Sequence, residues 1–322
     1  MIIPFLMLII FTIVLAKAAD IVVDSTSKLS KYLGISQVAL GLVVVAIITS
    51  LPELSIAITS ASAGEGAISA GNVFGSNIAN ILLVMGIGAF LYGFRIPWKN
   101  VGEIALILLL TTIISVYIIF SNTIQGWALG LYAGITLLAI FAGYVYYMMR
   151  SNRKMELEPV RKKVDRKKAA TAFFTFIAGI IVVFISSSLV VDNAVITAKS
   201  LGIAESLIGA TIIAVGTSLP ELSTTLQAVR RKKYGVAAGN LIGSNMTNLT
   251  LVLGATAVLS EIHVALPIFI AALLFAIVAN AILLYFAAVR KNLGKYTGIF
   301  FIAIYALFII VIIGLQASEI TV

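Results

Sequence analysis

The stretch Thr49-Ser50-Leu51-Pro52-Glu53 decides the fold, because the same five residues return 168 positions later as Thr217-Ser218-Leu219-Pro220-Glu221. A second block follows each copy at the same offset: Gly71-Asn72, Gly75-Ser76-Asn77 and Asn80 return as Gly239-Asn240, Gly243-Ser244-Asn245 and Asn248. The offset holds without a gap from Val22/Val190 to Gly86/Gly254. Each copy places one glutamate in a long apolar stretch. The sequence therefore predicts a duplicated membrane unit, and one buried acid per copy favours a cation site between the two halves.

The composition is that of a membrane protein. Apolar residues make up 61% of the chain and charged residues 11%, whereas a soluble domain has about 25% charged residues. The apolar runs are about 20 residues long, which is enough to cross a bilayer as helices. The chain has no cysteine, so disulfides and thiol chemistry are excluded. The net charge of +9 does not indicate a nucleic-acid partner, because the basic residues lie in short segments between apolar runs, as membrane topology requires.

The hydrophobic pattern predicts an all-α polytopic membrane protein with ten transmembrane helices. They are expected near residues 1–19, 35–60, 67–93, 102–120, 126–149, 170–191, 203–228, 236–260, 264–289 and 297–317. The chain is thereby divided into a first five-helix repeat at 1–149, a basic linker at 150–169 and a second five-helix repeat at 170–322. Residues 1–19 are expected to remain as a helix, because no basic segment of a signal peptide precedes them.

Because five is an odd number, the second repeat enters the membrane from the side opposite to the first. With the linker in the cytoplasm, the basic loop residues fall on the cytoplasmic side, as the positive-inside rule expects, and Lys199 is the exception. These residues are Lys28, Lys31, Arg95, Lys99, Arg230, Arg231, Lys232, Lys233, Arg290, Lys291 and Lys295. The prediction is a pair of inverted repeats in the cell membrane, with both termini extracellular.

Pro52 and Pro220 interrupt two of the predicted helices. A proline removes one backbone hydrogen bond and clashes with the carbonyl four residues earlier, which belongs here to Ile48 and Gly216. A freed carbonyl in lipid needs a partner, and a desolvated cation is one such partner. The alternative is a plain kink satisfied by a neighbouring helix. Two prolines at matched positions, each directly before a glutamate, favour the cation.

Glu53 and Glu221 fall in the middle of predicted spans, where an isolated carboxylate is unfavourable by at least about 3 kcal/mol. No lysine or arginine lies at a similar depth in any predicted span. Hard cations prefer oxygen ligands, and two carboxylates neutralise one divalent ion. The alternative is a protonated glutamic acid that hydrogen-bonds between helices.

Hydroxyl and amide side chains surround the two glutamates in the sequence. Asn72, Ser76 and Asn80 are spaced four residues apart and share one helix face, and the second copy repeats this spacing. Packing is the better interpretation for Asn72 and Asn240. The candidate ligands besides the glutamates are Thr49, Ser50, Ser76, Asn80, Thr217, Ser218, Ser244 and Asn248. Such an all-oxygen set suits Ca²⁺ or Na⁺ and disfavours Zn²⁺ and Cu²⁺.

These blocks resemble the two α-repeats of the calcium/cation antiporter superfamily, in its prokaryotic sodium/calcium exchanger branch. The matching stretches are 46–53 with 71–80, and 214–221 with 239–248. The resemblance implies a core of the second, third, seventh and eighth helices around four ion positions, with the first and sixth helices sliding across it. It implies that Glu53 and Glu221 bridge the Ca²⁺ and Na⁺ positions. It also implies hydroxyl donors from the threonines and serines named above, and backbone carbonyl donors at Ala46 and Ala214.

Two residues depart from the pattern of that family. Ile48 stands where the motif usually has glycine, and Asn248 stands where close prokaryotic relatives carry aspartate. The site then has two acids instead of three, which leaves the Na⁺ stoichiometry open.

The predicted function is antiport of Ca²⁺ against Na⁺ across the lipid bilayer. The alternative is a Ca²⁺/H⁺ exchanger in which the glutamates take up protons, and the inverted repeat disfavours a passive channel. An enzyme is not expected, because the single histidine, His263, lies near the end of a span. No cofactor beyond the transported ions and no obligate protein partner is expected.

Overall fold

The computed structural model describes residues 2–33, 40–62, 66–96, 101–124, 129–155, 166–200, 216–262, 266–290 and 292–320. In chain order the elements are α1 (Ile2–Leu33), the π-helical η1 (Leu40–Val45), α3 (Ala46–Thr49), α4 (Leu51–Ser62), α5 (Gly66–Ile78), η2 (Ala79–Val84), α6 (Met85–Tyr92), β1 (Phe94–Arg95), α7 (Val101–Ile124), α8 (Leu131–Met155), α9 (Arg166–Ser200), α12 (Leu219–Arg230), α13 (Tyr234–Thr247), η5 (Asn248–Val252), α14 (Leu253–Leu259), α15 (Leu266–Tyr285), η6 (Phe286–Arg290), β2 (Asn292–Leu293) and α16 (Lys295–Ile320). The predicted all-α membrane fold is confirmed.

Within these ranges, seven helical stretches are long and apolar enough to cross a membrane, and a bent pair from Leu40 to Thr59 makes an eighth. The described apolar part of α7, Ile104–Ile114, is shorter. The first half of the predicted span 203–228 lies outside the described residues, and so does His263.

The predicted ends of two spans were wrong. The first helix continues to Leu33 instead of ending near 19, and α9 continues to Ser200 instead of ending near 191. The polar residues that follow the apolar runs stay helical. Among them, the hydroxyls of Thr26 and Thr197 donate hydrogen bonds to backbone carbonyls of their own helix. At 1.5 Å per residue, the 32 residues of α1 are longer than the hydrocarbon layer is thick.

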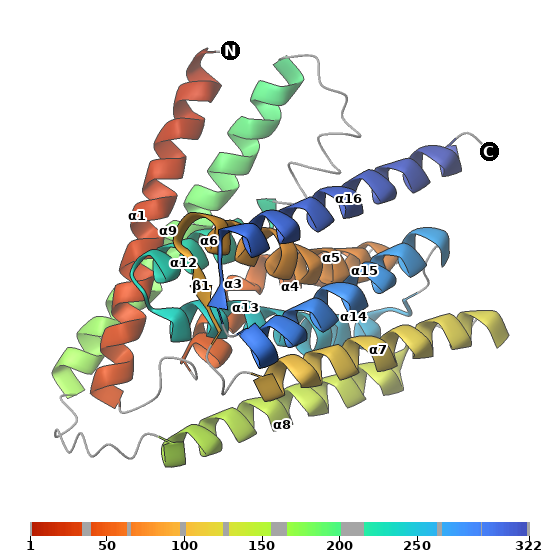
Figure 1. Cartoon of the computed structure of the whole chain (residues 1–322), viewed down its shortest axis with the longest axis horizontal. Coiled ribbons are helices and arrows are strands. Elements are labelled where there is room, and N and C mark those ends of the chain that lie inside the picture. The colour runs from red at the N-terminus through yellow and green to blue at the C-terminus, as the bar shows by residue number, and fades with distance from the viewer. Residues whose placement is uncertain are drawn as a thin grey trace.

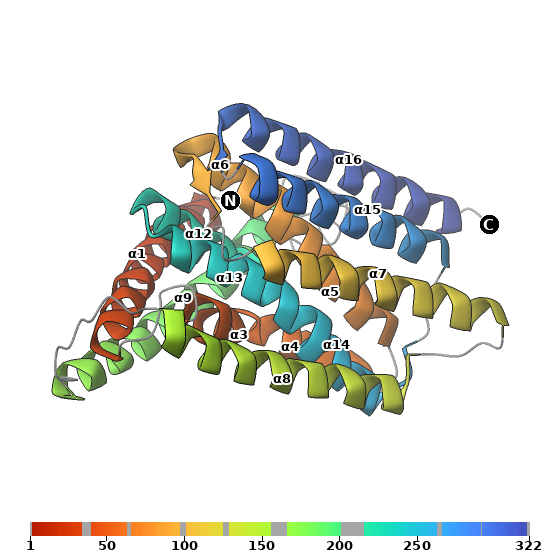
Figure 2. The same ribbon diagram turned by 60° about the horizontal axis from the view of Figure 1, so that its bottom comes forward.

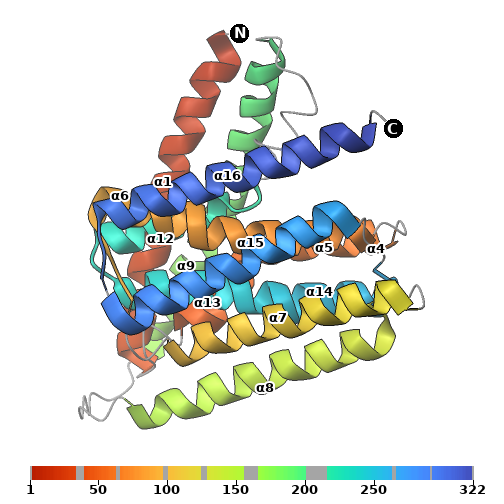
Figure 3. The same cartoon turned by 45° about the vertical axis from the view of Figure 1, so that its right-hand side comes forward.

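The helices α1 and α9 form a unit of their own. They lie side by side and cross the other long helices at a steep angle (Figures 1 and 3). Their contact is a small hydrophobic cluster with η1, and the main core is a separate cluster. In that main part of the protein, α15 packs between α16 and α7 (Figure 2). The α1–α9 pair is thus joined to the rest by comparatively few apolar side chains.

The two halves contact each other in matched pairs. A Cβ atom on Gly298 of α16 would lie 2.6 Å from the carbonyl oxygen of Gly86 in α6. The equivalent contact joins Gly134 of α8 to Gly254 of α14, at 2.7 Å. Glycine is required at both crossings because any side chain would separate the helices. The last helix of each half therefore packs on the third helix of the other half.

The short strands repeat the same exchange between halves. Phe94 in β1 pairs antiparallel with Leu293 in β2, and an isolated bridge joins Leu129 to Ile262 at the equivalent place. The two halves are interlocked instead of lying apart as separate bodies. The boundaries 1–149, 150–169 and 170–322 stay predictions, and the described helices continue into the linker region as far as Met155 and from Arg166.

The predicted breaks before the two prolines are confirmed. The helix that contains α3 and α4 bends by 43°. Ser50 ends α3 with φ −85° and ψ 9°, and Ser218 has nearly the same conformation, with φ −90° and ψ 8°, before α12. Since α4 and α12 restart at the next residue, each proline falls in a first helical turn, where its missing N–H breaks no bond.

Candidate ion-binding site

The two glutamates lie at the starts of two half-helices. Glu53 is in the first turn of α4 and Glu221 in the first turn of α12. Both side chains are at most 1% exposed. A helix N-terminus carries partial positive charge from its unpaired N–H groups, so it stabilises a carboxylate there. The two carboxyl groups are also near enough to repel each other when both are ionised.

Each glutamate accepts a hydrogen bond from the serine at the equivalent position of its own half. Ser76 Oγ donates to Glu53 Oε1 at 3.4 Å, and Ser244 Oγ donates to Glu221 Oε1 at 3.3 Å. Thr49, from the first half, lies 3.3 Å from Ser244 Oγ in the second half. The predicted site residues of the two halves therefore meet in one place.

Six buried oxygens of the predicted ligand set have no hydrogen-bond partner among the described residues, and they form three equivalent pairs. They are Ser50 and Ser218 Oγ, Glu53 and Glu221 Oε2, and Asn80 and Asn248 Oδ1. A buried polar atom without a partner is destabilising and rare in proteins. Ca²⁺ takes about six to eight oxygen ligands. The residues present fit a hard cation, because the unpaired atoms are all oxygens and include two carboxylates.

Four inter-helix hydrogen bonds orient the asparagine ligand candidates. Asn80 Nδ2 donates to Asn245 Oδ1 at 3.0 Å, and Asn248 Nδ2 donates to Asn77 Oδ1 at 3.1 Å. Asn77 and Asn245 in turn donate to each other's backbone carbonyls, at 3.2 and 3.3 Å. With its amide nitrogen engaged, each ligand asparagine presents only its carbonyl oxygen. Outer partners of this kind fix the ligands of metal sites.

Asn77 and Asn245 were not among the predicted site residues. Their recurrence at the same offset in the second block was a signal, but no ligand role distinguished them from packing residues. The π-helical turns that begin at Ala79 and at Asn248 were not predicted either. Such turns occur often at functional sites, and here they fall on the two ligand asparagines.

Other candidates have packing roles or fall outside the described residues. Asn240 accepts from Thr49 Oγ1 and donates to Thr225 Oγ1, both at 3.1 Å, which supports the packing interpretation. The half-buried Thr217 lines a cavity instead of lying fully buried like Thr49. Ala214 is not among the described residues.

Two expected backbone ligands have other partners. The Ala46 carbonyl accepts from Ser50 N at 3.1 Å, and Thr49 Oγ1, whose hydroxyl also reaches Asn240, lies 3.3 Å from it. The Ile48 carbonyl accepts a backbone N–H at the end of α3, so the prediction that the proline leaves it free was wrong. The chain turns tightly after Thr49, and this turn supplies the donor.

The G-x-x-x-G spacing of Gly71/Gly75 and Gly239/Gly243 predicts a close helix approach in both copies. The prediction is confirmed for the second copy and wrong for the first, where a Cβ on Gly71 or Gly75 would meet no described atom within 4 Å. A Cβ on Gly243 would lie 2.5 Å from the Leu42 carbonyl oxygen and 2.6 Å from the Ala46 Cβ. A Cβ on Gly41 of η1 would lie 3.1 Å from the Gly239 Cα. This contact brings α3 against α13 and thereby places Thr49 beside Ser244.

Comparison with known proteins identifies the class of protein. The family model described as sodium/calcium exchanger protein matches residues 3–150 and 171–314. The chain is a multi-pass membrane protein of the ion-exchanger class, and it belongs to the sodium/calcium exchanger protein family.

Individual relatives agree with this assignment. The chain is 28% identical over 342 residues to the sodium/calcium exchanger MaX1 of Methanosarcina acetivorans, covering 96% of this chain and 98% of the relative. It is 30% identical over 293 residues to the uncharacterized membrane protein MJ0091 of Methanocaldococcus jannaschii, covering 91% and 92%. The solved structure of the sodium-calcium exchanger NCX_Mj soaked with Na⁺ and Sr²⁺ superposes with a TM-score of 0.81 at 26% identity, covering 95% and 97%.

Proposed function

We propose that this protein is a secondary-active antiporter that exchanges Ca²⁺ for Na⁺ by alternating access to a site near the middle of the membrane. The observation that carries the proposal is the set of six unpaired buried oxygens in three equivalent pairs. The family assignment and the names of the relatives support the choice of ions.

The charges of the site favour exchange over leak. Two ionised glutamates balance one Ca²⁺ or two Na⁺, so the loaded states have similar charge. Without a cation, the two carboxylates at the ends of α4 and α12 repel each other. The protein is therefore expected to change access only when cations occupy the site. Outward movement of one ion is then coupled to inward movement of the other.

The site residues proposed to touch the ions are Glu53, Glu221, Ser50, Ser218, Ser76, Ser244, Asn80 and Asn248, with Thr49 and Thr217 as further hydroxyls. Asn77 and Asn245 hold the two ligand asparagines in place. The proposed location is the cell membrane, with the linker cytoplasmic and both termini outside.

The test is Ca²⁺ flux in proteoliposomes. Vesicles loaded with Na⁺ and diluted into Na⁺-free buffer are expected to take up Ca²⁺, and a pH gradient without Na⁺ is expected to do much less. Full uptake driven by protons, with no response to Na⁺, would identify a Ca²⁺/H⁺ exchanger instead. Uptake that runs to equilibrium with neither gradient would indicate a channel. Protein with both Glu53→Gln and Glu221→Gln is the matched control for passive leak.

A further inference from the structure

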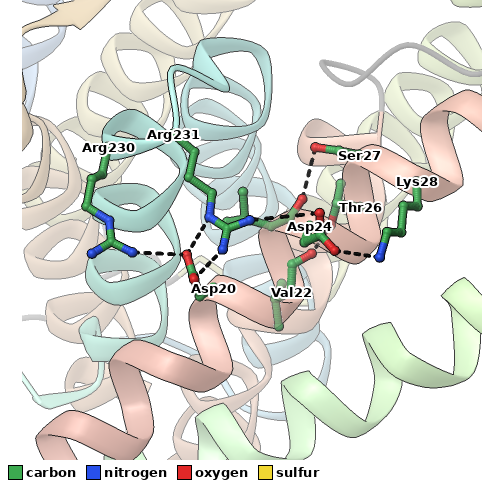
Figure 4. Close-up of polar contacts among 9 residues, drawn as sticks. Asp20, Val22, Asp24, Thr26, Ser27, Lys28, Arg230 and Arg231 are labelled. Carbon is green, nitrogen blue, oxygen red and sulfur yellow. Dashed lines mark hydrogen bonds and ion pairs between the residues drawn. The ribbon is translucent and has the colours of Figure 1, made fainter.

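Two aspartates occupy equivalent positions on the paired helices: Asp24 on α1 and Asp192 on α9. On α1 the negative charge is compensated. Asp24 pairs with Lys28 at 2.7 Å and lies 3.8 Å from Arg231. Its neighbour Asp20 accepts hydrogen bonds from Arg230 and Arg231 (Figure 4). These pairs join α1 to the turn between α12 and α13.

Asp192 lacks the equivalent of every one of these basic partners. Ile196 stands where α1 has Lys28, and Ser62 and Ala63 stand where the second half has Arg230 and Arg231. In the described part of the chain, Asp192 makes no ion pair or side-chain hydrogen bond, and it is exposed. The two equivalent aspartates therefore differ: the charge of Asp24 is neutralised by basic side chains, whereas the charge of Asp192 is not neutralised by any described residue.

Asp192 also lies on a cavity, of about 200 Å³, that reaches the starts of both half-helices. The lining includes Asp192, Ser187 and Ser188 from α9, and both Pro52 and Pro220. Each proline directly precedes a glutamate of the candidate site. Ser187 is 5% exposed, and its hydroxyl has no hydrogen-bond partner among the residues that the structure describes. The cavity thus carries a free carboxylate and an unpaired buried hydroxyl.

We propose that Asp192 and Ser187 form an outer cation site, which collects Ca²⁺ or Na⁺ and passes it on to Glu53 and Glu221. The proposal rests on the exchange function proposed above. A free carboxylate at a cavity entrance raises the local concentration of cations, and carboxylate and hydroxyl oxygens are hard ligands. A single carboxylate binds weakly, which suits an ion that must move on. At the α1 end Asp20 and Asp24 are paired with basic side chains and offer no free carboxylate, so the proposed site serves one face of the membrane only.

The first test measures the local charge without transport. Because the chain has no cysteine, Ser188→Cys provides one thiol beside Asp192. A cationic methanethiosulfonate is expected to react faster than an anionic one. Asp192→Asn is expected to change each rate about threefold in opposite directions, so that their ratio falls about tenfold at low salt. Asp192→Glu is the matched control and keeps the ratio. The proposal is overturned if the thiol does not react, or if Asp192→Asn leaves the ratio of the two reaction rates unchanged.

The second test measures transport from each face. Asp192→Asn is expected to raise the half-saturating Ca²⁺ concentration about three- to tenfold when Ca²⁺ is presented at the face where α9 ends. The maximal rate and the opposite face stay unchanged, and high ionic strength removes the difference. Equal half-saturation in Asp192→Asn and wild-type protein overturns the outer site. If wild-type protein shows no Na⁺-driven Ca²⁺ flux, the proposed exchange function is wrong. The ratio of the two thiol reaction rates then still tests whether the cavity is negatively charged.

Discussion

Replacing Asn77 or Asn245 by alanine tests whether the two halves are joined by symmetric hydrogen bonds. Each side chain makes two bonds: it donates to the backbone of the equivalent asparagine and accepts from a ligand asparagine. Inter-helix hydrogen bonds in membrane proteins contribute about 0.6 kcal/mol each on average, and at most about 1.7. Each single variant is therefore expected to lose about 1–3 kcal/mol of unfolding free energy, and the two losses are expected to be equal.

The bond pattern also predicts how the losses combine. In the described part of the chain, the side chains of Asn77 and Asn245 bond to each other's backbone and not to each other, so their double variant is expected to lose about the sum of the two single losses. Asn77 and Asn248 share a bond of 3.1 Å. Their double variant is expected to lose less than the sum, by about 0.6–1.7 kcal/mol.

The measurement is unfolding of purified protein in mixed detergent micelles. Asn280→Ala is the matched control. Its side chain is equally buried, but it donates only to the Ala276 carbonyl of its own helix, so its loss is expected to be smaller. Clearly unequal losses at Asn77 and Asn245, or losses no larger than that of Asn280→Ala, would refute the symmetric junction.

Three further changes test the site and the helix crossings. Glu53→Gln and Glu221→Gln remove half of the site charge each, so both are expected to abolish Na⁺-driven Ca²⁺ uptake to a similar extent; normal flux in either would make that residue structural. Gly298→Ala places a Cβ 2.6 Å from a backbone oxygen of α6 and is expected to lower thermal stability by about 1–3 kcal/mol, whereas Gly143→Ala, with open space around it, is expected to be neutral or slightly stabilising. Asn248→Asp adds a carboxylate that must bind a cation or a proton, so Ca²⁺ flux is expected to shift with pH and Na⁺ relative to wild type; superimposable curves would place Asn248 outside the energetics of the site.

The parts of the fold that could be predicted are those set by local rules. The breaks before Pro52 and Pro220 follow from proline geometry, and they fall at Ser50 and Ser218, two residues before each proline. The burial of Glu53 and Glu221 follows from their place in apolar runs. The close crossing at Gly243 agrees with the spacing of small residues, but the same spacing at Gly71 and Gly75 gives no close contact among the described residues.

The parts that could not be predicted depend on pairing between distant segments. Nothing in the local sequence says that Asn77 contacts Asn245, because the contact exists only once the halves are docked. The predicted ends of α1 and α9 came too early because the polar residues that follow each apolar run are typical of loops. Likewise, the Ile48 carbonyl was expected to be free because proline chemistry alone does not include the turn that follows Thr49.

The centre of the molecule is symmetric and its two ends are not, and this division has a consequence for exchange. In the proposed alternating-access cycle, the two equivalent halves exchange roles between the inward-open and the outward-open state. The ion ligands are then nearly the same in both states, so the central site alone favours neither state strongly. Asp20 forms ion pairs with the α12–α13 turn at one end (Figure 4), and the equivalent position at the other end, Ser188, has no charge to form them. An exposed pair contributes up to about 1 kcal/mol, enough to shift a balanced equilibrium about fivefold. We therefore expect the preference between the two states to be set at the ends of α1 and α9, where it can change without altering any atom of the proposed ion site.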